Sequence, residues 1–386
     1  MRKYLFIIFF SLVFTASCLV YIPYSEEDVA PPVGEEYYED YEGPLDVSYF
    51  YNYLDPYGIW VYHPPYGYVW IPEDVSYRWR PYSYGRWVWS DYGWTWISDY
   101  RWGWIPFHYG RWGWDRGLGW FWVPDTVWGP AWVTWRRGEM YVGWAPLPPE
   151  AVFVVGVGVE HPRFTFPSTY WIFVEWNYFM DPYLRRYVLP YERNFTIINF
   201  TVIRTNIYVR EGRVINGGID LDYARRYSRK RISKYQLKDV RRPGVSKIKV
   251  NELEVYRPTI KKSQAAKPKR VLNETEAQGR ISEVKIKKLE EETTPTAGKS
   301  RLRDVQNREL EILEQSQQKE ENAIRQKMVR EKEAAESASE KEKVEKEYRE
   351  KIVKLKKSHT EEKAKVEKRH EEEKKKVEKK KIKKKK

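Results

Sequence analysis

The stretch that decides the fold is residues 84–89 (YGRWVW) followed by residues 93–98 (GWTWIS). Within each half the tryptophans alternate with other residues, which places them on one face of a β-strand. Ser90-Asp91-Tyr92-Gly93 joins the halves with residues typical of turns. The pattern therefore predicts an antiparallel hairpin whose tryptophans meet across the two strands.

The same pattern occurs three more times. Copies lie at residues 57–62 (YGIWVY) with 67–72 (GYVWIP), and at 109–114 (YGRWGW) with 119–124 (GWFWVP). A divergent copy at 132–149 ends in YVGWAPLPP, and 17 of the 19 tryptophans lie between Trp60 and Trp144. Since one hairpin is marginal in water, we expect the copies to pack on one another, either as a closed barrel or as an open stack.

The YGRWxW and GWxWxP repeats that end in YVGWAPLPP resemble a family of exported bacterial proteins, domain of unknown function 6600. The resemblance extends over residues 46–220, because Asn216-Gly217-Gly218 after a predicted strand also fits the second half of that family. It implies export and a tryptophan-rich repeat fold. It transfers no catalytic residue, since the resemblance implies no activity.

The tryptophans have two possible uses. They can form a core of large aromatic side chains in a thin domain, or a subset can form an exposed ladder on which sugar rings stack. The candidate stacking residues are Trp87, Trp89, Trp94, Trp96, Trp112, Trp114, Trp120 and Trp122. The candidate polar contacts beside them are Arg86, Asp91, Arg111 and Asp115.

The sequence predicts a protein that is not an enzyme and needs no cofactor. None of the five histidines has the spacing of a metal site, and neither a nucleophile elbow nor a phosphate loop is present. Two carboxylates in an aromatic cleft are typical of a glycoside hydrolase, and Asp91 and Asp115 are the candidates for this remote alternative. Both residues lie in turns, where aspartate is common for conformational reasons.

Residues 1–18 have the pattern of an export signal. The positive start, Arg2 and Lys3, precedes an apolar run at 4–14 that is shorter than the roughly 20 residues a membrane span requires. Small residues then lead to Cys18, the single cysteine, as in the lipobox of bacterial lipoproteins. We therefore expect an exported protein anchored to a membrane by lipid at Cys18, in the periplasm or at the outer membrane or cell surface. An ordinary signal with an incidental cysteine is the alternative.

Composition divides the rest of the chain into segments, which predicts a multi-domain protein. Residues 19–45 are an acidic, proline-containing spacer, and residues 259–298 read as a disordered linker. Between them, 46–150 form the all-β aromatic repeat domain and 151–258 a small α+β segment. In that segment we expect a hairpin that turns at Glu211-Gly212-Arg213 and a short helix that begins near Asp220. Cations clustered between Arg225 and Arg242 can attract phosphate or carboxylate polymers, or form a solvated surface.

Residues 299–386 predict a long charged helix with a lysine-rich tail. Glutamates precede lysines or arginines by four residues at many places, which supports a helix, and about eighty residues would extend ~120 Å. The apolar seam is thin, so a coiled coil and a lone helix both remain open. The expected function is an envelope lipoprotein that binds peptidoglycan, another polysaccharide or a protein partner; an oligomeric scaffold built through residues 299–386 is the alternative. Nucleic acid is not expected as a partner of an exported protein.

Overall fold

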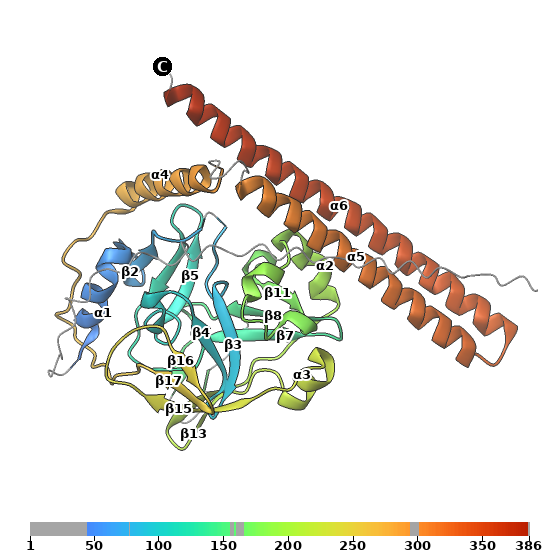
Figure 1. Cartoon of the computed structure of the whole chain (residues 1–386), viewed down its shortest axis with the longest axis horizontal. Helices are drawn as coiled ribbons and strands as arrows, with labels where there is room; N and C mark the ends of the chain where they lie inside the picture. The colour runs from blue at the N-terminus through green and yellow to red at the C-terminus, as the bar shows by residue number, and fades with distance from the viewer. Residues whose placement is uncertain (1–44, 77, 155–157, 160–165, 294–300, 385–386) are drawn as a thin grey trace, which may run out of the picture.

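The computed structural model describes residues 45–384, apart from residue 77 and segments 155–157, 160–165 and 294–300. The predicted export signal, Cys18 and residues 19–44 of the acidic spacer lie outside the described residues. A β-rich body carries two long helices along one side, and these helices extend beyond it (Figure 1).

All four aromatic repeats form antiparallel hairpins, as predicted. They are β1 (Gly58–His63) with β2 (Gly67–Pro72), β3 (Gly85–Ser90) with β4 (Gly93–Ser98), β5 (Arg111–Asp115) with β6 (Gly119–Val123), and β7 (Val133–Arg137) with β8 (Tyr141–Pro146). Tryptophans face each other across every hairpin, as in the pairs Trp60–Trp70, Trp87–Trp96, Trp112–Trp122 and Trp135–Trp144. The period-two pattern therefore correctly predicted the strands and the pairing of tryptophans across them.

The hairpins are not stacked in sequence order. The first and third share one sheet, β1-β2-β6-β5, joined where Trp70 of β2 pairs with Trp122 of β6. The second hairpin belongs to the seven-stranded sheet β13-β14-β4-β3-β15-β17-β16, and the fourth to the sheet β11-β8-β7-β12. The four hairpins are therefore distributed over three sheets, in place of the single barrel or single stack that the sequence left open.

Residues 46–150 and 151–258 form one body, because strands from both segments share sheets. The later strands are β9 (Phe153–Val154), β10 (Gly158–Val159), β11 (Ile172–Glu175), β12 (Val202–Ile203), β13 (Ile207–Arg210), β14 (Arg213–Asn216), β15 (Lys234–Asp239), β16 (Lys247–Lys249) and β17 (Glu252–Val255). The predicted hairpin is confirmed as β13 and β14, and the predicted helix as α3 (Leu221–Ser228). Two further short helices are α1 (Val47–Leu54) and α2 (Asn194–Asn199).

The core lies where the inner faces of the hairpins meet, and it is built mainly of indole rings. Trp87 packs on Trp135 with 4.5 Å between ring centroids, which joins the second and fourth hairpins. Phe107 lies 6.4 Å from Trp96 and 6.0 Å from Trp112, which connects the second hairpin to the third. Aromatic pairs in such tilted geometries contribute about 0.5–1.5 kcal/mol each beyond their burial.

The glycine of each Tyr-Gly repeat makes room for this packing. A Cβ on Gly85 would lie 2.2 Å from the carbonyl oxygen of Ile97, and one on Gly110 2.2 Å from that of Val123. Both glycines also have positive φ angles, 144° and 67°. The motif therefore needs glycine for the close approach of the partner strand and for the backbone conformation.

Helix α4 (Glu274–Thr293) covers the outer face of the sheet β1-β2-β6-β5. Ala277 and Ile281 pack against its apolar side chains, and Arg280 donates two hydrogen bonds of 2.5 and 2.6 Å to Glu73. The prediction that 259–298 is a disordered linker is therefore wrong for this helix. The sequence of α4 is mostly polar because only one narrow row of its side chains packs on the sheet.

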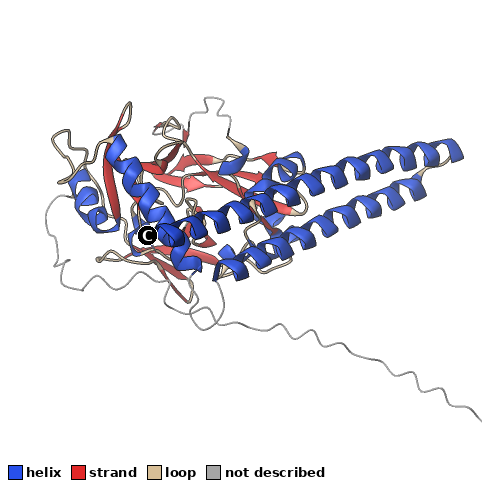
Figure 2. Ribbon diagram, turned by 90° about the horizontal axis from the view of Figure 1, so that it is seen from above, coloured by secondary structure: helices blue, strands red, loops and turns tan. Residues whose placement is uncertain are grey.

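The charged C-terminal region is two helices, α5 (Arg301–Ala334) and α6 (Ala338–Lys384), which fold back on each other (Figure 2). The expected single ~120 Å helix is wrong because the chain turns just before Ser337. Ser337 Oγ accepts from the Glu340 backbone N–H at 3.2 Å, and Glu340 accepts from the Ser337 N–H at 3.2 Å, which together start α6. Of the helices described, none is long and apolar enough to cross a bilayer.

Charged side chains hold the two helices to the body, and we call this contact the ionic interface. Its members are Arg78, Glu192 and Arg193 of the body and Glu309, Glu320, Glu362, Arg369 and Glu373 of the helices. Arg193 Nη2 lies 2.6 Å from Glu320, and its Nη1 lies 3.2 Å from Glu362. Arg78 bridges Glu309 and Glu373 in the same way. The helices are thus anchored by ion pairs that the chain forms with itself.

Candidate functional site

The structure divides the eight candidate stacking tryptophans into two groups. Trp87, Trp94, Trp96, Trp112 and Trp122 are buried to 1% exposure or less, and their faces are covered by other rings. Their packing places them in the core, so they offer no surface for a sugar in this structure. Trp89 and Trp120 are half-buried, and Trp114 is 47% exposed.

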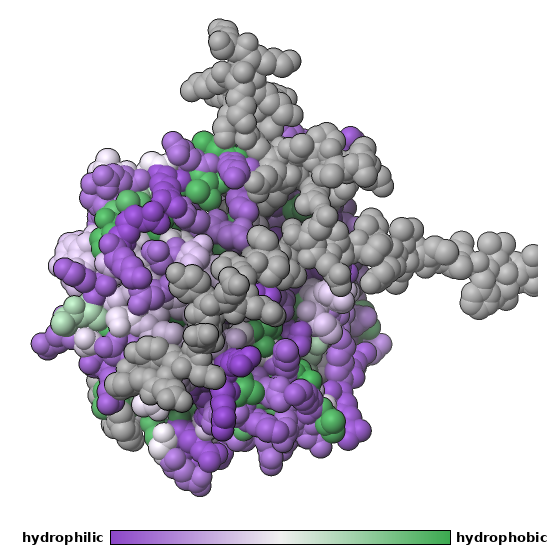
Figure 3. Space-filling view, turned by 60° about the vertical axis from the view of Figure 1, so that its left-hand side comes forward, coloured by the Kyte–Doolittle hydropathy of each residue, from purple (hydrophilic) through white to green (hydrophobic). Residues whose placement is uncertain are grey.

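Several of the buried indoles are also held by hydrogen bonds to the backbone. The Trp94 Nε1–H donates to the carbonyl of Ile219 at 2.8 Å, and that of Trp122 to the carbonyl of Tyr109 at 2.7 Å. A buried indole N–H needs a partner, and these carbonyls supply one. Trp94 therefore links two sequence-distant segments, whereas Trp122 stabilises its own repeat. The face shown in Figure 3 is mostly hydrophilic with small hydrophobic patches.

Trp114, Trp120 and Tyr170 form an exposed aromatic surface at one end of the β5–β6 hairpin, which we call the ring patch. Trp114 and Trp120 are opposite each other across the hairpin. The Tyr170 ring lies 4.8 Å from Trp120 and 6.4 Å from Trp114. Rings held in place by neighbouring rings need little ordering to receive a flat apolar face.

Carboxylates lie beside the ring patch. The pKa of the Tyr170 hydroxyl is raised, first by partial burial and then by the charges of Glu150 and Asp115. Glu150 accepts a hydrogen bond from the Tyr66 hydroxyl, and burial and this bond raise the pKa of Tyr66 to about 12. Few polar groups beside an aromatic surface are the usual composition of a small-ligand site.

Asp115 has a structural role at the turn of this hairpin. Its carboxylate accepts backbone N–H bonds from Gly117 at 2.6 Å and Leu118 at 3.0 Å. These bonds, the one from Leu118 foremost, lower the pKa of Asp115 below its usual value. Asp115 therefore orders the turn that carries Trp114 and Trp120 at its two ends.

The remaining candidate polar residues lie elsewhere. Arg111 is buried at 5% exposure, with its guanidinium 3.6 Å above the Trp132 ring and its Nε donating to the Ala151 carbonyl at 3.2 Å. Burial lowers the pKa of Arg111 to about 10. Arg86 is half-buried near Asp99, whose pKa burial raises and Arg86 lowers in part. Both arginines therefore have structural roles within the β-rich body.

Asp91 supports a neighbouring strand. It accepts the Leu237 backbone N–H at 2.9 Å and so helps to hold β15 against β3. Asp91 and Asp115, the carboxylate pair considered for a hydrolase, belong to turns of different sheets. In the described part of the chain, no three His, Cys, Asp or Glu side chains are grouped to hold a metal ion.

Residues 51–151 match DUF6600, a family of unknown function. This match covers the four hairpins and confirms the resemblance for the repeats. It ends before β9, so the predicted extension of the resemblance to residue 220 lies outside the match. Neither a curated protein nor a solved structure matches the chain.

The sequence did not indicate Tyr170 as a partner of the hairpin β5–β6. Tyr170 belongs to a short 3-10 turn, Ser168–Tyr170, far from β5 and β6 in the sequence. No periodicity connects the two, so no local pattern could have placed it. The sequence also did not show which tryptophans are buried. Trp112 and Trp114 lie on the same strand face, but only Trp112 reaches the core.

Proposed function

We propose that the protein is a non-catalytic binding protein of the bacterial cell envelope that holds envelope glycan at the ring patch. Export, and a lipid anchor at Cys18, are part of this proposal and follow from the sequence pattern of residues 1–18. The DUF6600 hairpins then serve as a rigid frame, and the long helices stay attached to that frame through the ionic interface.

The observation that carries the proposal is the exposure of Trp114. Its ring is 47% exposed, although most tryptophans of the repeats are buried. An exposed indole next to two further rings leaves apolar surface in contact with water, which is unfavourable. A ligand that covers the rings removes this cost, and such patches mark binding surfaces. The C–H face of a sugar suits the rings, while its hydroxyls suit the carboxylates of Asp115 and Glu150.

The scaffold alternative is less well supported. Three apolar residues expected to belong to an intermolecular seam, Leu313, Ile352 and Leu355, are buried within the chain, where α5 and α6 pack on each other, although Val305 is 47% exposed. Self-association through the buried residues would therefore require the two helices to separate first. The hydrolase alternative gains no support from the separated Asp91 and Asp115.

The test is retention of the purified protein on insoluble peptidoglycan and on a panel of insoluble polysaccharides at moderate salt. Trp114→Ala should lose most of the retention because the most exposed ring of the patch is removed. The matched control is Tyr62→Ala, which alters an exposed aromatic residue at the equivalent position of the first repeat, with 56% exposure. Equal retention of all three proteins, or none for any of them, would reject glycan binding at the ring patch.

A further inference from the structure

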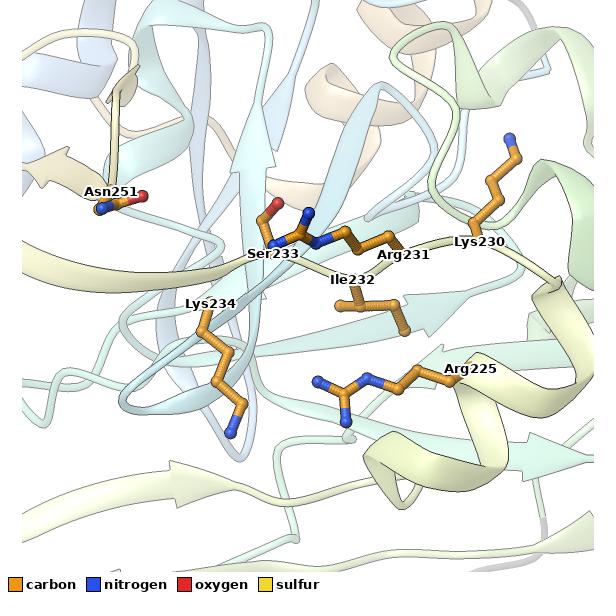
Figure 4. Close-up of a pocket in the computed structure, with 7 residues that line it drawn as sticks. All are labelled: Arg225, Lys230, Arg231, Ile232, Ser233, Lys234 and Asn251. Atoms are coloured by element: carbon orange, nitrogen blue, oxygen red, sulfur yellow. The ribbon is translucent and has the colours of Figure 1, made fainter.

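A hollow lined by cations lies between helix α3 and strand β15. It has a volume of about 480 Å³ and is lined by Arg225, Lys230, Arg231, Ile232, Ser233, Lys234 and Asn251. We call it the basic hollow. Figure 4 shows the side chains of Arg225 and Lys234 directed toward the same space below Ile232, whereas Lys230 points away from it. This hollow lies within the cationic segment from Arg225 to Arg242.

Most cations that line the basic hollow have no carboxylate partner. Arg225 pairs with Asp222 at 3.0 Å, but within the described residues no ion pair is found for Lys230, Arg231 or Lys234. Exposed lysines nearby do have partners: Lys238 lies 2.8 Å from Glu252, for example. Unpaired cations that gather in a concave site repel one another, and an anion between them would remove that repulsion.

The backbone that carries these cations is held on both sides. Helix α3 is capped by Asp220, which accepts the N–H groups of Asp222 and Tyr223 at 3.0 Å each. Arg229 ends the helix in the left-handed conformation with φ 53°, and its N–H donates to the Arg225 carbonyl at 3.1 Å. The connection to β15 is therefore fixed in direction as it leaves the helix.

An apolar anchor and a strand pairing fix the other side. Ile232 is 3% exposed and packs in the main aromatic core, so the segment between Arg231 and Ser233 cannot move freely. Lys234 opens β15, where it pairs with Trp89 of β3, and the Asp91 carboxylate holds the same strand through Leu237. The cations are thus displayed by a preformed backbone, which lowers the entropy lost on binding.

From this arrangement we infer that the basic hollow is a binding site for a phosphate group. A phosphate carries about −1.5 to −2 charges at neutral pH, which balances several cations, whereas a single carboxylate would leave most of them unneutralised. The arginine forks of Arg225 and Arg231 suit phosphate oxygens, and Lys234 adds a point charge. Ser233 and Asn251 lie at the edge of the hollow and supply further donors.

This site is separate from the ring patch and does not rest on the proposed glycan binding. The phosphate can belong to a soluble polymer or to a lipid headgroup, and these two sources share the same recognition chemistry. All the lining side chains except that of Ile232 are exposed, so binding should weaken steeply as salt rises.

The experiment measures binding of the full chain to polyphosphate by calorimetry at low salt, and to vesicles of phosphatidylglycerol with phosphatidylcholine by sedimentation. The double variant Arg231→Ala, Lys234→Ala should lose about tenfold or more in affinity for at least one probe. Arg226→Ala is the matched control, because Arg226 is an exposed arginine on the same helix that does not line the hollow.

The two probes separate the sources of phosphate. Binding to polyphosphate alone indicates a soluble or polymeric phosphate, and binding to anionic vesicles alone indicates a lipid headgroup; either result supports the site if the double variant loses it. Equal losses for Arg226→Ala and the double variant, or no saturable binding to either probe, would overturn it. Trp114→Ala should bind both probes like the unaltered protein, which keeps this test independent of the glycan test.

Discussion

The Arg193 guanidinium and the Glu320 carboxylate, 2.6 Å apart, have side-chain exposures of 0% and 1%. Arg193 comes from the body and Glu320 from α5, so this pair lies at the centre of the ionic interface. The same guanidinium also contacts Glu362 of α6 and donates to the Tyr141 hydroxyl at 3.1 Å. One body residue therefore neutralises a glutamate from each long helix.

Arg193→Ala should release the long helices from the body. The substitution leaves Glu320 and Glu362 buried without a cation, and removal of one partner from a buried ion pair costs ~3–5 kcal/mol. Amide hydrogen exchange should rise across α5 and α6 while the hairpins β1 to β8 stay protected. The control is Lys327→Ala, which removes an exposed pair with Glu139 at 3.2 Å and should cost less than about 1 kcal/mol. Unchanged exchange in Arg193→Ala would contradict the anchoring role of this residue.

The ionic interface should weaken in acid through Glu309. Burial raises the pKa of Glu309, but the hydrogen bond from His370 and the charges of Arg78 and Arg369 outweigh it and bring the pKa to about 2, against 4.5 for a free glutamate. A lowered pKa in the folded state stabilises it above pH 4.5, and this contribution is lost as the pH falls from 4.5 toward 2. Hydrogen exchange of α5 and α6 measured across that window should show the loss.

The Glu309→Gln variant separates this carboxylate from the others. It should lack part of the pH dependence between 4.5 and 2, because the titrating group is gone. Glu333→Gln, an exposed carboxylate on the same helix, should retain the full dependence. Identical pH profiles for the two variants would show that Glu309 does not govern the acid response.

His108 should make the body less stable in mild acid. It is buried at 4% exposure, with Nδ1 2.9 Å from the Gly129 carbonyl and its ring stacked on Trp128. Burial lowers its pKa from 6.5 to about 4, although the bond to Gly129 opposes this. Because the unfolded chain binds this proton first, stability falls by up to about 3 kcal/mol as the pH drops from 6.5 to 4. NMR titration should find the ring neutral at pH 5, and a ring that protonates near pH 6.5 would contradict this.

Gly110→Ala should destabilise the third hairpin more than its backbone angle alone explains. The new Cβ would lie 2.2 Å from the Val123 carbonyl oxygen and 2.6 Å from Trp122 Nε1, so both the Val123 backbone and the buried Trp122 ring must shift. Gly67→Ala is the matched control, since Gly67 also has a positive φ of 78° but has nothing within 4 Å of the new Cβ. The melting temperature should fall clearly further for Gly110→Ala, and equal decreases would assign the effect to backbone strain alone.

The hairpins could be predicted because their signals are local. Trp87 and Trp89 alternate on one strand, and Asp91 and Gly93 mark the turn that follows. The start of α6 also had a local signal, Ser337 followed three residues later by Glu340, which is a capping box. This signal predicts a helix start after Ser337 and therefore two helices in the long charged region.

The rest depended on contacts between distant residues. The sequence does not show that Trp70 pairs with Trp122 in preference to a tryptophan of the second repeat, because all copies carry similar rings. Nor does it show that Glu320 is buried, since glutamate in a charged helix is normally solvated. Its burial follows from Arg193, which lies more than one hundred residues earlier in the chain. The basic hollow is an intermediate case, because its cations are close together in the sequence but the pattern shows neither the hollow nor the contribution of Asn251.

The pairing of the first hairpin with the third also sets an order of assembly. The edge of β2 cannot pair with β6 until the whole second hairpin, which lies between them in the chain, has also emerged. The outer face of the same sheet then waits for Ala277 and Ile281 of α4. A chain that stops before α4 exposes an apolar sheet face, and truncated products should therefore aggregate or be degraded in the compartment where this protein folds.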